Sequence, residues 1–233
     1  MSRELLFLLG GSEGTLDLVA EEFVPAAGGG EAVIALLFAF AHGWEDHLAE
    51  YTEPWGRRGA TRYHIIAPEE SGVLDVQKAS TQLREATGLF IGGGDTACYH
   101  QLYAAEPMRS IIRARYRAGV PVGGLSAGAL ISPELCIVSE NAPGGRCPRL
   151  ASGLGLLSDL LVGVHFSDRQ DSLTTLLDAM SVARIGRGLG IDSTACAVLV
   201  GGEVKRVLGQ SVHEITMTDF ESQTHTVEVI VAR

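Results

Sequence analysis

Short apolar runs, most of which end beside glycine or proline, alternate along the chain with segments of helical spacing. Continuous apolar runs are typical of parallel strands that are covered on both faces, because half-exposed strands would alternate polar with apolar residues. This alternation predicts the α/β fold class, with a doubly wound, mostly parallel sheet. We interpret five runs as buried strands: Leu5–Leu9, Ala32–Phe40, His64–Ala67, Gly88–Ile91 and Val120–Gly123. The spacing predicts helices at Leu16–Phe23, Val76–Ala86, Ala97–Ala105 and Met108–Ala118.

The C-terminal part of the sequence has a different pattern. Ala195–Val200 and Val204–Leu208 flank a Gly-Gly turn, which predicts an antiparallel hairpin. Thr224–Val231 alternates polar with apolar residues, as a half-exposed strand does. We therefore expect antiparallel edge strands after the parallel sheet. No fixed-period repeat and no linker divides the sequence, so we expect a single domain over residues 1–233.

Charge and cysteine content exclude several classes of function. The 233 residues carry a formal net charge of −10, which opposes binding to nucleic acid or to an anionic membrane surface. The four cysteines form no C-x-x-C pair, and no histidines stand at zinc-finger spacing, so we expect neither a metal site nor a disulfide framework. The apolar run Leu5–Leu9 is too short for a signal peptide or a membrane span. We expect a cytoplasmic protein.

The sharpest local signal is the segment Gly124-Leu-Ser126-Ala-Gly128, which follows a predicted strand and precedes a helix-like stretch. It has the G-x-S-x-G pattern of a nucleophile elbow, where glycines leave room for a serine on a tight strand-to-helix turn. The N–H of Ala127 would then be free to donate to an oxyanion. Chance occurrence in a glycine-rich chain is the alternative reading of this pattern.

A second glycine-rich loop, Gly92-Gly-Gly-Asp95-Thr96, also follows a predicted strand. It could supply a second oxyanion donor, for which we select the N–H of Gly93, or it could be a simple tight turn. A phosphate-binding loop is excluded, because neither G-K-[ST] nor G-x-G-x-x-G spacing is present.

A serine nucleophile needs a base, and His165 has the most suggestive context of the seven histidines. It ends the apolar run Leu160–Val164, at a point where catalytic side chains gather in open α/β sheets. It also lies 39 residues after Ser126, with most of the C-terminal segment still to come. α/β-Hydrolases place their histidine near the C-terminus, so that fold is excluded.

Six segments in order resemble the peptidase E (aspartyl dipeptidase) and cyanophycinase family of serine peptidases, and this resemblance implies a flavodoxin-like sheet of the class I glutamine amidotransferase-like fold. These segments are LLGGSE, FIGGGDT, GGLSAGA, GLGLL, HFSDR and GLGIDSTACAV. The seven residues between GLGLL and the histidine are closer to the cyanophycinase branch than to the peptidase E branch.

The resemblance implies that Ser126 is the nucleophile, that His165 is the base, and that Gly93 and Ala127 form the oxyanion hole. It places the third triad member near Glu140; Glu134 is the alternative, and an exposed loop glutamate is the plain structural reading. We assign substrate binding to Asp95, Thr96 and Arg169. Arg169 either holds a substrate carboxylate or pairs with Asp168 or Asp192 inside the fold.

Departures from the family pattern bear on the substrate. Gly163 and Val164 replace an Asp-Gln pair of cyanophycinases, Gln170 and Asp171 replace basic residues, and Asp95 stands where peptidase E has asparagine.

We expect a serine exopeptidase or dipeptidase for short aspartyl or isoaspartyl peptides, with no cofactor. The family is also compatible with a homodimer. A glutaminase-like amidotransferase subunit, which would need a cysteine in place of Ser126, and a non-catalytic peptide-binding or sensor protein are the alternatives.

Overall fold

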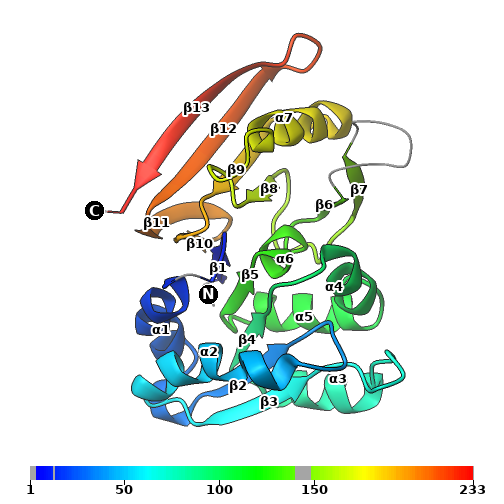
Figure 1. Ribbon diagram of the computed structural model, residues 1–233, viewed down its shortest axis with the longest axis vertical. Helices are drawn as coiled ribbons and strands as arrows, with labels where there is room; N and C mark the ends of the chain where they lie inside the picture. The colour runs from blue at the N-terminus through cyan, green and yellow to red at the C-terminus, as the bar shows by residue number, and fades with distance from the viewer. Residues whose placement is uncertain (1–3, 13, 140–147, 233) are drawn as a thin grey trace.

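A computed structural model of the chain describes residues 4–12, 14–139 and 148–232. Within them, seven strands form the main sheet in the order β11-β10-β1-β5-β4-β2-β3 (Figure 1). Strands β1, β5, β4, β2 and β3 run parallel to one another, whereas β10 pairs antiparallel with β1 and β11 pairs antiparallel with β10 at the edge of the sheet. The bounds are β1 Leu5–Leu9, β2 Val33–Leu37, β3 Arg62–Ile66, β4 Gly88–Ile91, β5 Val122–Leu125, β10 Ala195–Val200 and β11 Glu203–Gly209.

Helices cover both faces of this sheet. Successive side chains of β1 point to opposite faces of the sheet, and all of them are apolar: Leu6 and Leu8 belong to one buried cluster, and Phe7 and Leu9 to the other. Both faces therefore need a layer of helices to cover them. One face packs against α1 (Thr15–Ala26) and α2 (Trp44–Arg57), and the other against α3 (Val76–Glu85), α4 (Thr96–Tyr103), α5 (Met108–Arg117) and the short α6 (Ala127–Leu130). A 3-10 turn, η1, spans Gly29–Glu31. The predicted fold class is confirmed: a mixed α/β structure with a large, mostly parallel sheet.

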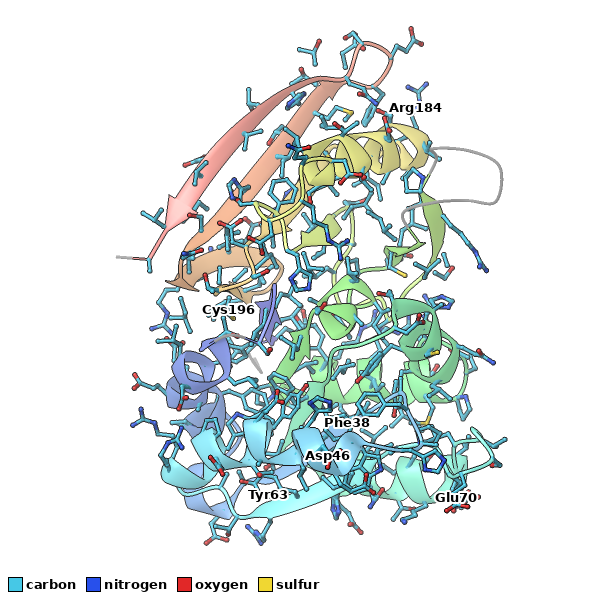
Figure 2. The ribbon with its side chains drawn as sticks, viewed as in Figure 1. Phe38, Asp46, Tyr63, Glu70, Arg184 and Cys196 are labelled. Atoms are coloured by element: carbon cyan, nitrogen blue, oxygen red, sulfur yellow. The ribbon has the colours of Figure 1, made fainter. Side chains whose placement is uncertain are left out.

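Aromatic rings fill the layer under α2, a helix that the sequence analysis did not predict. Phe38, labelled in Figure 2, lies just beyond β2 and is about 1% exposed. Its ring contacts those of Trp44 and Tyr51 on this helix. Tyr51 in turn meets Phe90 of β4 at a ring-centroid distance of 5.7 Å. The helix is thereby fixed against the sheet close to the glycine-rich loop that follows β4.

A second sheet was not expected, and Thr224–Val231 is an antiparallel edge strand of this sheet and not of the main one. That strand, β13, has the predicted bounds, but it pairs with β12 (Ser211–Asp219) in a four-stranded sheet of order β13-β12-β9-β8. β8 (Leu161–Val164) and β9 (Arg187–Ile191) run parallel, and α7 (Ser172–Ala183) packs on this sheet (Figure 1). The predicted Ala195–Leu208 hairpin does form the edge of the main sheet. A separate pair joins β6 (Leu135–Ser139) to β7 (Arg149–Ser152).

The two sheets bring several strand ends together. β5 of the main sheet ends at Leu125, and β8 of the second sheet ends at Val164. The residues that follow these strands, Ser126 and His165, are the two that the sequence analysis selected.

None of the helices in the described ranges is long and apolar enough to cross a bilayer. The single domain over residues 1–233 stays a prediction.

Candidate active site

Ser126 lies in the tight turn between β5 and α6. Its backbone has φ 48° and ψ −102°, a conformation that residues other than glycine rarely adopt. The turn is fixed by a hydrogen bond of 2.9 Å from the Ser126 N–H to the carbonyl of Leu9 in β1. This strained turn projects the side chain out of the end of the sheet.

The two flanking glycines are required by close backbone contacts. A Cβ added to Gly124 would lie 2.7 Å from the carbonyl carbon of Gly128. A Cβ on Gly128 would lie 2.4 Å from the carbonyl oxygen of Ile91, at the end of β4. The spacing G-x-S-x-G therefore reflects packing of the elbow against the neighbouring strand, as the motif predicts.

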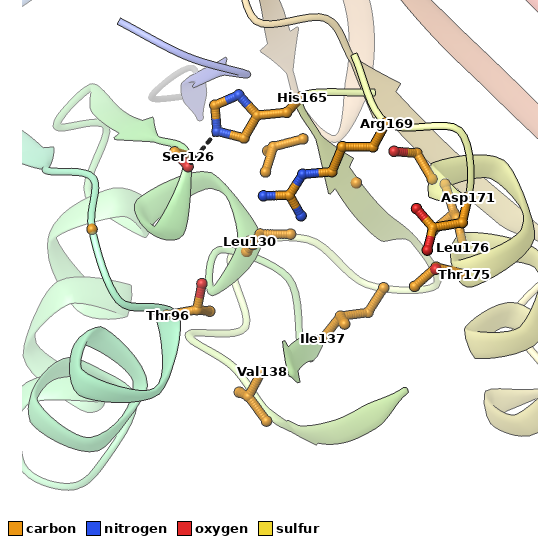
Figure 3. Close-up of a pocket in the computed structure, with 14 residues that line it drawn as sticks. Thr96, Ser126, Leu130, Ile137, Val138, His165, Arg169, Asp171, Thr175 and Leu176 are labelled. Carbon is orange, nitrogen blue, oxygen red and sulfur yellow. Dashed lines mark hydrogen bonds between the residues drawn. The ribbon is translucent and has the colours of Figure 1, made fainter. Parts of the chain in front are cut away.

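His165 faces Ser126 from the second sheet. The Oγ of Ser126 lies 3.0 Å from Nε2 of His165, and Figure 3 shows the imidazole directed at the hydroxyl. His165 also has a positive φ, 51°, which turns the chain sharply at the end of β8. The next N–H, that of Phe166, donates to the carbonyl of Ile191 in β9 at 3.1 Å. The structure thus brings together the serine and the histidine that the sequence analysis paired.

A second serine lies behind the imidazole. Nδ1 of His165 is 2.6 Å from the Oγ of Ser193, and the Ser193 hydroxyl donates a hydrogen bond to Asp168. Sequence reasoning assigned no role to Ser193, which follows β9 within the family segment GLGIDSTACAV. Two signals could have found it: its place in that segment, and its place after the strand parallel to β8, because adjacent parallel strands end at the same edge of a sheet.

Asp192, next to Ser193, is 6% exposed and has three hydrogen-bond partners of its own. It accepts from the N–H of Ser167 at 3.1 Å and from the Ser167 hydroxyl at 2.6 Å, and it lies 3.2 Å from Nε2 of His213. These bonds connect the loop after β8 to the turn after β9. The sequence analysis gave pairing of Arg169 with Asp168 or Asp192 as an alternative to substrate binding. Both carboxylates already accept hydrogen bonds, Asp168 from Ser193 and Asp192 from Ser167, so a pairing with Arg169 would have to share them.

The glycine-rich loop after β4 lies beside the elbow. The carbonyl of Gly92 accepts from the N–H of Gly128 at 3.2 Å, and the carbonyl of Gly93 accepts from the Tyr99 hydroxyl at 3.1 Å. Burial raises the pKa of Tyr51 to about 12, opposed by a hydrogen bond from the Gly93 N–H to its phenol oxygen. The predicted oxyanion donor Gly93 is therefore directed in part at Tyr51. The N–H of Ala127, the first residue of α6, has no preceding helical carbonyl to bond.

Asp95 and Thr96 have different places. Oδ1 of Asp95 accepts from the N–H of Cys98 at 2.9 Å and caps α4, which is a structural task. Thr96 lines a cavity beside Ser126 (Figure 3). Of the two residues, Thr96 is the one that lines this cavity, and its role in substrate binding stays a prediction.

Two cavities meet at the Ser126–His165 pair. One, of about 370 Å³, lies between α6 and α7; Arg169 projects into it, and Leu130, Ile137 and Leu176 form its apolar wall (Figure 3). The other, of about 430 Å³, lies on the α2 side and is lined by Phe40, His47, Glu50 and Tyr51. A ligand in contact with the Ser126 hydroxyl can therefore extend in two directions.

Two glutamates, Glu140 and Glu134, are the predicted candidates for the third triad member. Glu140 lies outside the described residues, so its prediction stays untested. The alternative, Glu134, lines a different cavity with Arg113 and Tyr116, and its backbone N–H bonds to Leu157. The described residues contain no group of three or more His, Cys, Asp or Glu side chains that could hold a metal ion.

A model of peptidase family S51 matches residues 6–208. The chain belongs to this family. It is therefore a hydrolase, a serine-type peptidase. A cyanophycinase from Synechococcus elongatus is 28% identical over 228 residues, which cover 95% of this chain and 70% of that protein. A cyanophycinase from Nostoc sp. is 26% identical over 233 residues, covering 97% and 77% of the two chains.

Two solved structures have a similar fold. A peptidase from an acI-B1 Actinobacterium aligns with a TM-score of 0.71 and 18% identity, covering 97% of this chain and 96% of that one. A Listeria monocytogenes EGD-e protein that carries the name peptidase E aligns with a TM-score of 0.63 and 16% identity, covering 90% of this chain and 100% of that one. These likenesses support the fold, and the predicted relation to peptidase E and cyanophycinase is confirmed.

Proposed function

We propose that this peptidase hydrolyses short aspartyl or isoaspartyl peptides, with Ser126 as its nucleophile and His165 as its base. The observation that carries the proposal is the 3.0 Å contact between Ser126 Oγ and His165 Nε2, at the junction of two cavities. A peptide extends on both sides of its scissile bond, and each side would occupy one cavity. The combined space suits a dipeptide or tripeptide, which favours exopeptidase action.

The chemistry follows from this placement. His165 Nε2 takes the proton of the Ser126 hydroxyl while Oγ attacks the substrate carbonyl carbon. The N–H of Ala127, with that of Gly93 when it is released from Tyr51, stabilises the oxyanion. The carbon–nitrogen bond then breaks, and His165 returns the proton to the leaving amine. Water, deprotonated in turn by His165, clears the acyl-enzyme and restores the serine.

An acidic substrate is favoured by Arg169, whose guanidinium projects into the cavity on the α7 side (Figure 3). Arginine binds a carboxylate in a planar, two-pronged geometry, which suits an aspartyl or isoaspartyl side chain or a peptide C-terminus. The named relatives are cyanophycinases, and the aspartyl and isoaspartyl substrate class rests on the resemblance to the peptidase E and cyanophycinase family. Asp171 lies in the same cavity, at a position where the cyanophycinase pattern has a basic residue, and its negative charge disfavours a substrate that carries several acidic groups.

The test is a mass-spectrometric digest of a peptide panel that contains α-Asp-X, β-Asp-Arg and β-Asp-Lys, with neutral asparaginyl peptides as matched controls. Wild type should cleave the aspartyl or isoaspartyl members, and Ser126→Ala should cleave none. Arg169→Gln should raise KM for the acidic peptides more than it lowers kcat, because the lost contact is present before the reaction as well as during it.

Other outcomes of the panel point to the alternative functions. Ammonia release from glutamine without peptide cleavage would favour a glutaminase-like subunit. Tight peptide binding without turnover by wild type would favour a sensor or binding protein. Cleavage of neutral and acidic peptides at equal rates would overturn the assignment of Arg169 but not that of Ser126.

A further inference from the structure

We propose that His165 is oriented and electrostatically supported through a two-step relay, in which the Ser193 hydroxyl bridges the imidazole to the carboxylate of Asp168. The inference rests on the proposed function, because it concerns how the base acts on Ser126. It makes Ser193 and Asp168 positioning residues. The relay differs from a triad in which a carboxylate contacts the imidazole directly.

Hydrogen-bond accounting fixes the direction of each bond in the relay. An ionised carboxylate has acceptors only, so the single hydroxyl proton of Ser193 is committed to Asp168. Ser193 Oγ can then only accept from Nδ1 of His165, which lies 2.6 Å away. Nδ1 therefore carries the ring proton of the neutral imidazole. Nε2 is left with a lone pair facing Ser126 Oγ, as a general base requires.

The same chain of bonds supports the charged form of the base. When Nε2 takes the serine proton, the imidazole becomes a cation whose Nδ1–H still donates to Ser193. The negative charge of Asp168 then lies one hydroxyl group away. Polarisation along consecutive hydrogen bonds strengthens each of them, so a distant carboxylate can stabilise the cation through the serine.

The backbone around Ser193 holds it at this place. The N–H of Ala195 bonds to the carbonyl of Asp192 at 2.9 Å, and the N–H of Asp168 bonds to the carbonyl of His165 at 3.2 Å. A Cβ on Gly11 would lie 2.7 Å from the Ser193 carbonyl oxygen and 3.2 Å from Cε1 of His165. The loop after β1 therefore closes tightly over both residues, which limits their movement.

The residue next to Ser193 provides a matched control. The hydroxyl of Thr194 is buried and has no hydrogen-bond partner among the described residues. Thr194→Val keeps the shape of this side chain and removes an unpaired hydroxyl, so the turn is perturbed without loss of a hydrogen bond. Ser193→Thr is the conservative variant, because it keeps the hydroxyl that the relay needs.

The experiment measures the second-order rate at which an aryl phosphonate ester labels Ser126. Labelling needs proton removal from the serine but no natural substrate. Ser193→Ala should slow labelling by roughly 100-fold to 1,000-fold, within the range of general-base effects. Ser193→Thr should restore most of the rate, and Thr194→Val should match wild type.

Asp168→Asn gives an independent variant at an exposed side chain, where a change is tolerated by the fold. An asparagine amide can donate to Ser193 and reverse both bonds, which puts the ring proton on Nε2. Labelling should then be at least as slow as in Ser193→Ala. The double variant Ser193→Ala/Asp168→Asn should be no slower than Ser193→Ala, because the carboxylate acts through the hydroxyl.

A spectroscopic readout is independent of turnover. In the Ser126→Ala background, proton NMR should show a low-field resonance of the His165 Nδ1–H, and Ser193→Ala should shift or remove it. Wild type that is not labelled at all would overturn the proposed function and with it the relay. Wild type that is labelled, with Ser193→Ala labelled equally fast, would overturn the relay alone. Slow labelling of Glu140→Gln together with normal labelling of Ser193→Ala would also overturn the relay.

Discussion

The strained backbone of Ser126 predicts that this residue lowers the stability of the fold. A non-glycine residue at φ 48° and ψ −102° carries roughly 1–3 kcal/mol of strain. Ser126→Gly removes that strain, while the greater freedom of glycine in the unfolded chain costs about 0.5–1 kcal/mol. Ser126→Ala is the proper reference, because it also loses the hydroxyl but keeps the strain. We expect Ser126→Gly to be more stable than Ser126→Ala by about 1 kcal/mol.

Differential scanning calorimetry of the two variants at equal concentration measures this difference. For a chain of 233 residues, 1 kcal/mol corresponds to a Tm shift of about 2–4 °C. Ala118→Gly is the matched control, because Ala118 is exposed and has φ −76°, where glycine brings only its entropic cost. That control should lower Tm. Equal Tm values for Ser126→Gly and Ser126→Ala, or a lower value for the glycine variant, would refute the claim that the elbow is strained.

Two further predictions concern the elbow and the buried titratable groups. Gly128→Ala should lower stability by about 1–3 kcal/mol and reduce activity, because its Cβ would lie 2.4 Å from the Ile91 carbonyl oxygen; a urea unfolding curve like that of wild type would contradict this. Burial raises the pKa of Tyr51 from 10.0 and of Cys136 from 9.0, each to about 12. The folded state thus holds these protons more tightly than the unfolded state, so the urea midpoint should be insensitive to these groups below pH 9 and should fall as the pH rises from about 9 to 12. A midpoint that rises over that interval would have the wrong sign.

The main sheet was accessible from sequence because its strands are buried on both faces. Leu5–Leu9 and Gly88–Ile91 have the predicted bounds, since an uninterrupted apolar run ends where the chain turns at glycine. Helix α2 was not predicted because it buries little: Tyr51, Pro54 and Trp55 are its buried residues. So short an apolar stripe, interrupted by proline, gives no clear helical period.

The second sheet was not accessible for a different reason. In β9 the glycines Gly188 and Gly190 break the apolar run, and a Cβ on Gly190 would lie 2.5 Å from the ring of Phe166. These glycines make room for neighbouring side chains, and a search for alternating apolar residues in the sequence does not detect such contacts. Nor does the sequence tell which strands share a sheet, so Thr224–Val231 was predicted with the correct bounds but without its partner strand, β12.

The site was predictable to the extent that it depends on local motifs. Ser126 stands in such a motif, and His165 follows a recognisable apolar run. Ser193 lies 28 residues from His165 and 25 residues from Asp168, and its contacts come from the pairing of β8 with β9. No local pattern encodes that pairing, and the resemblance to the family directed the search for the third triad member to Glu140, with Glu134 as the alternative.

The most direct test of the account is to locate the covalent adduct that a serine-reactive phosphonate forms on the folded protein. Intact-mass spectrometry followed by peptide mapping should find a single adduct, on Ser126, and His165→Ala should abolish it. That result would establish an activated nucleophile at the junction of the two cavities. An adduct on another serine, or equal labelling of Ser126 after His165 is removed, would contradict the account.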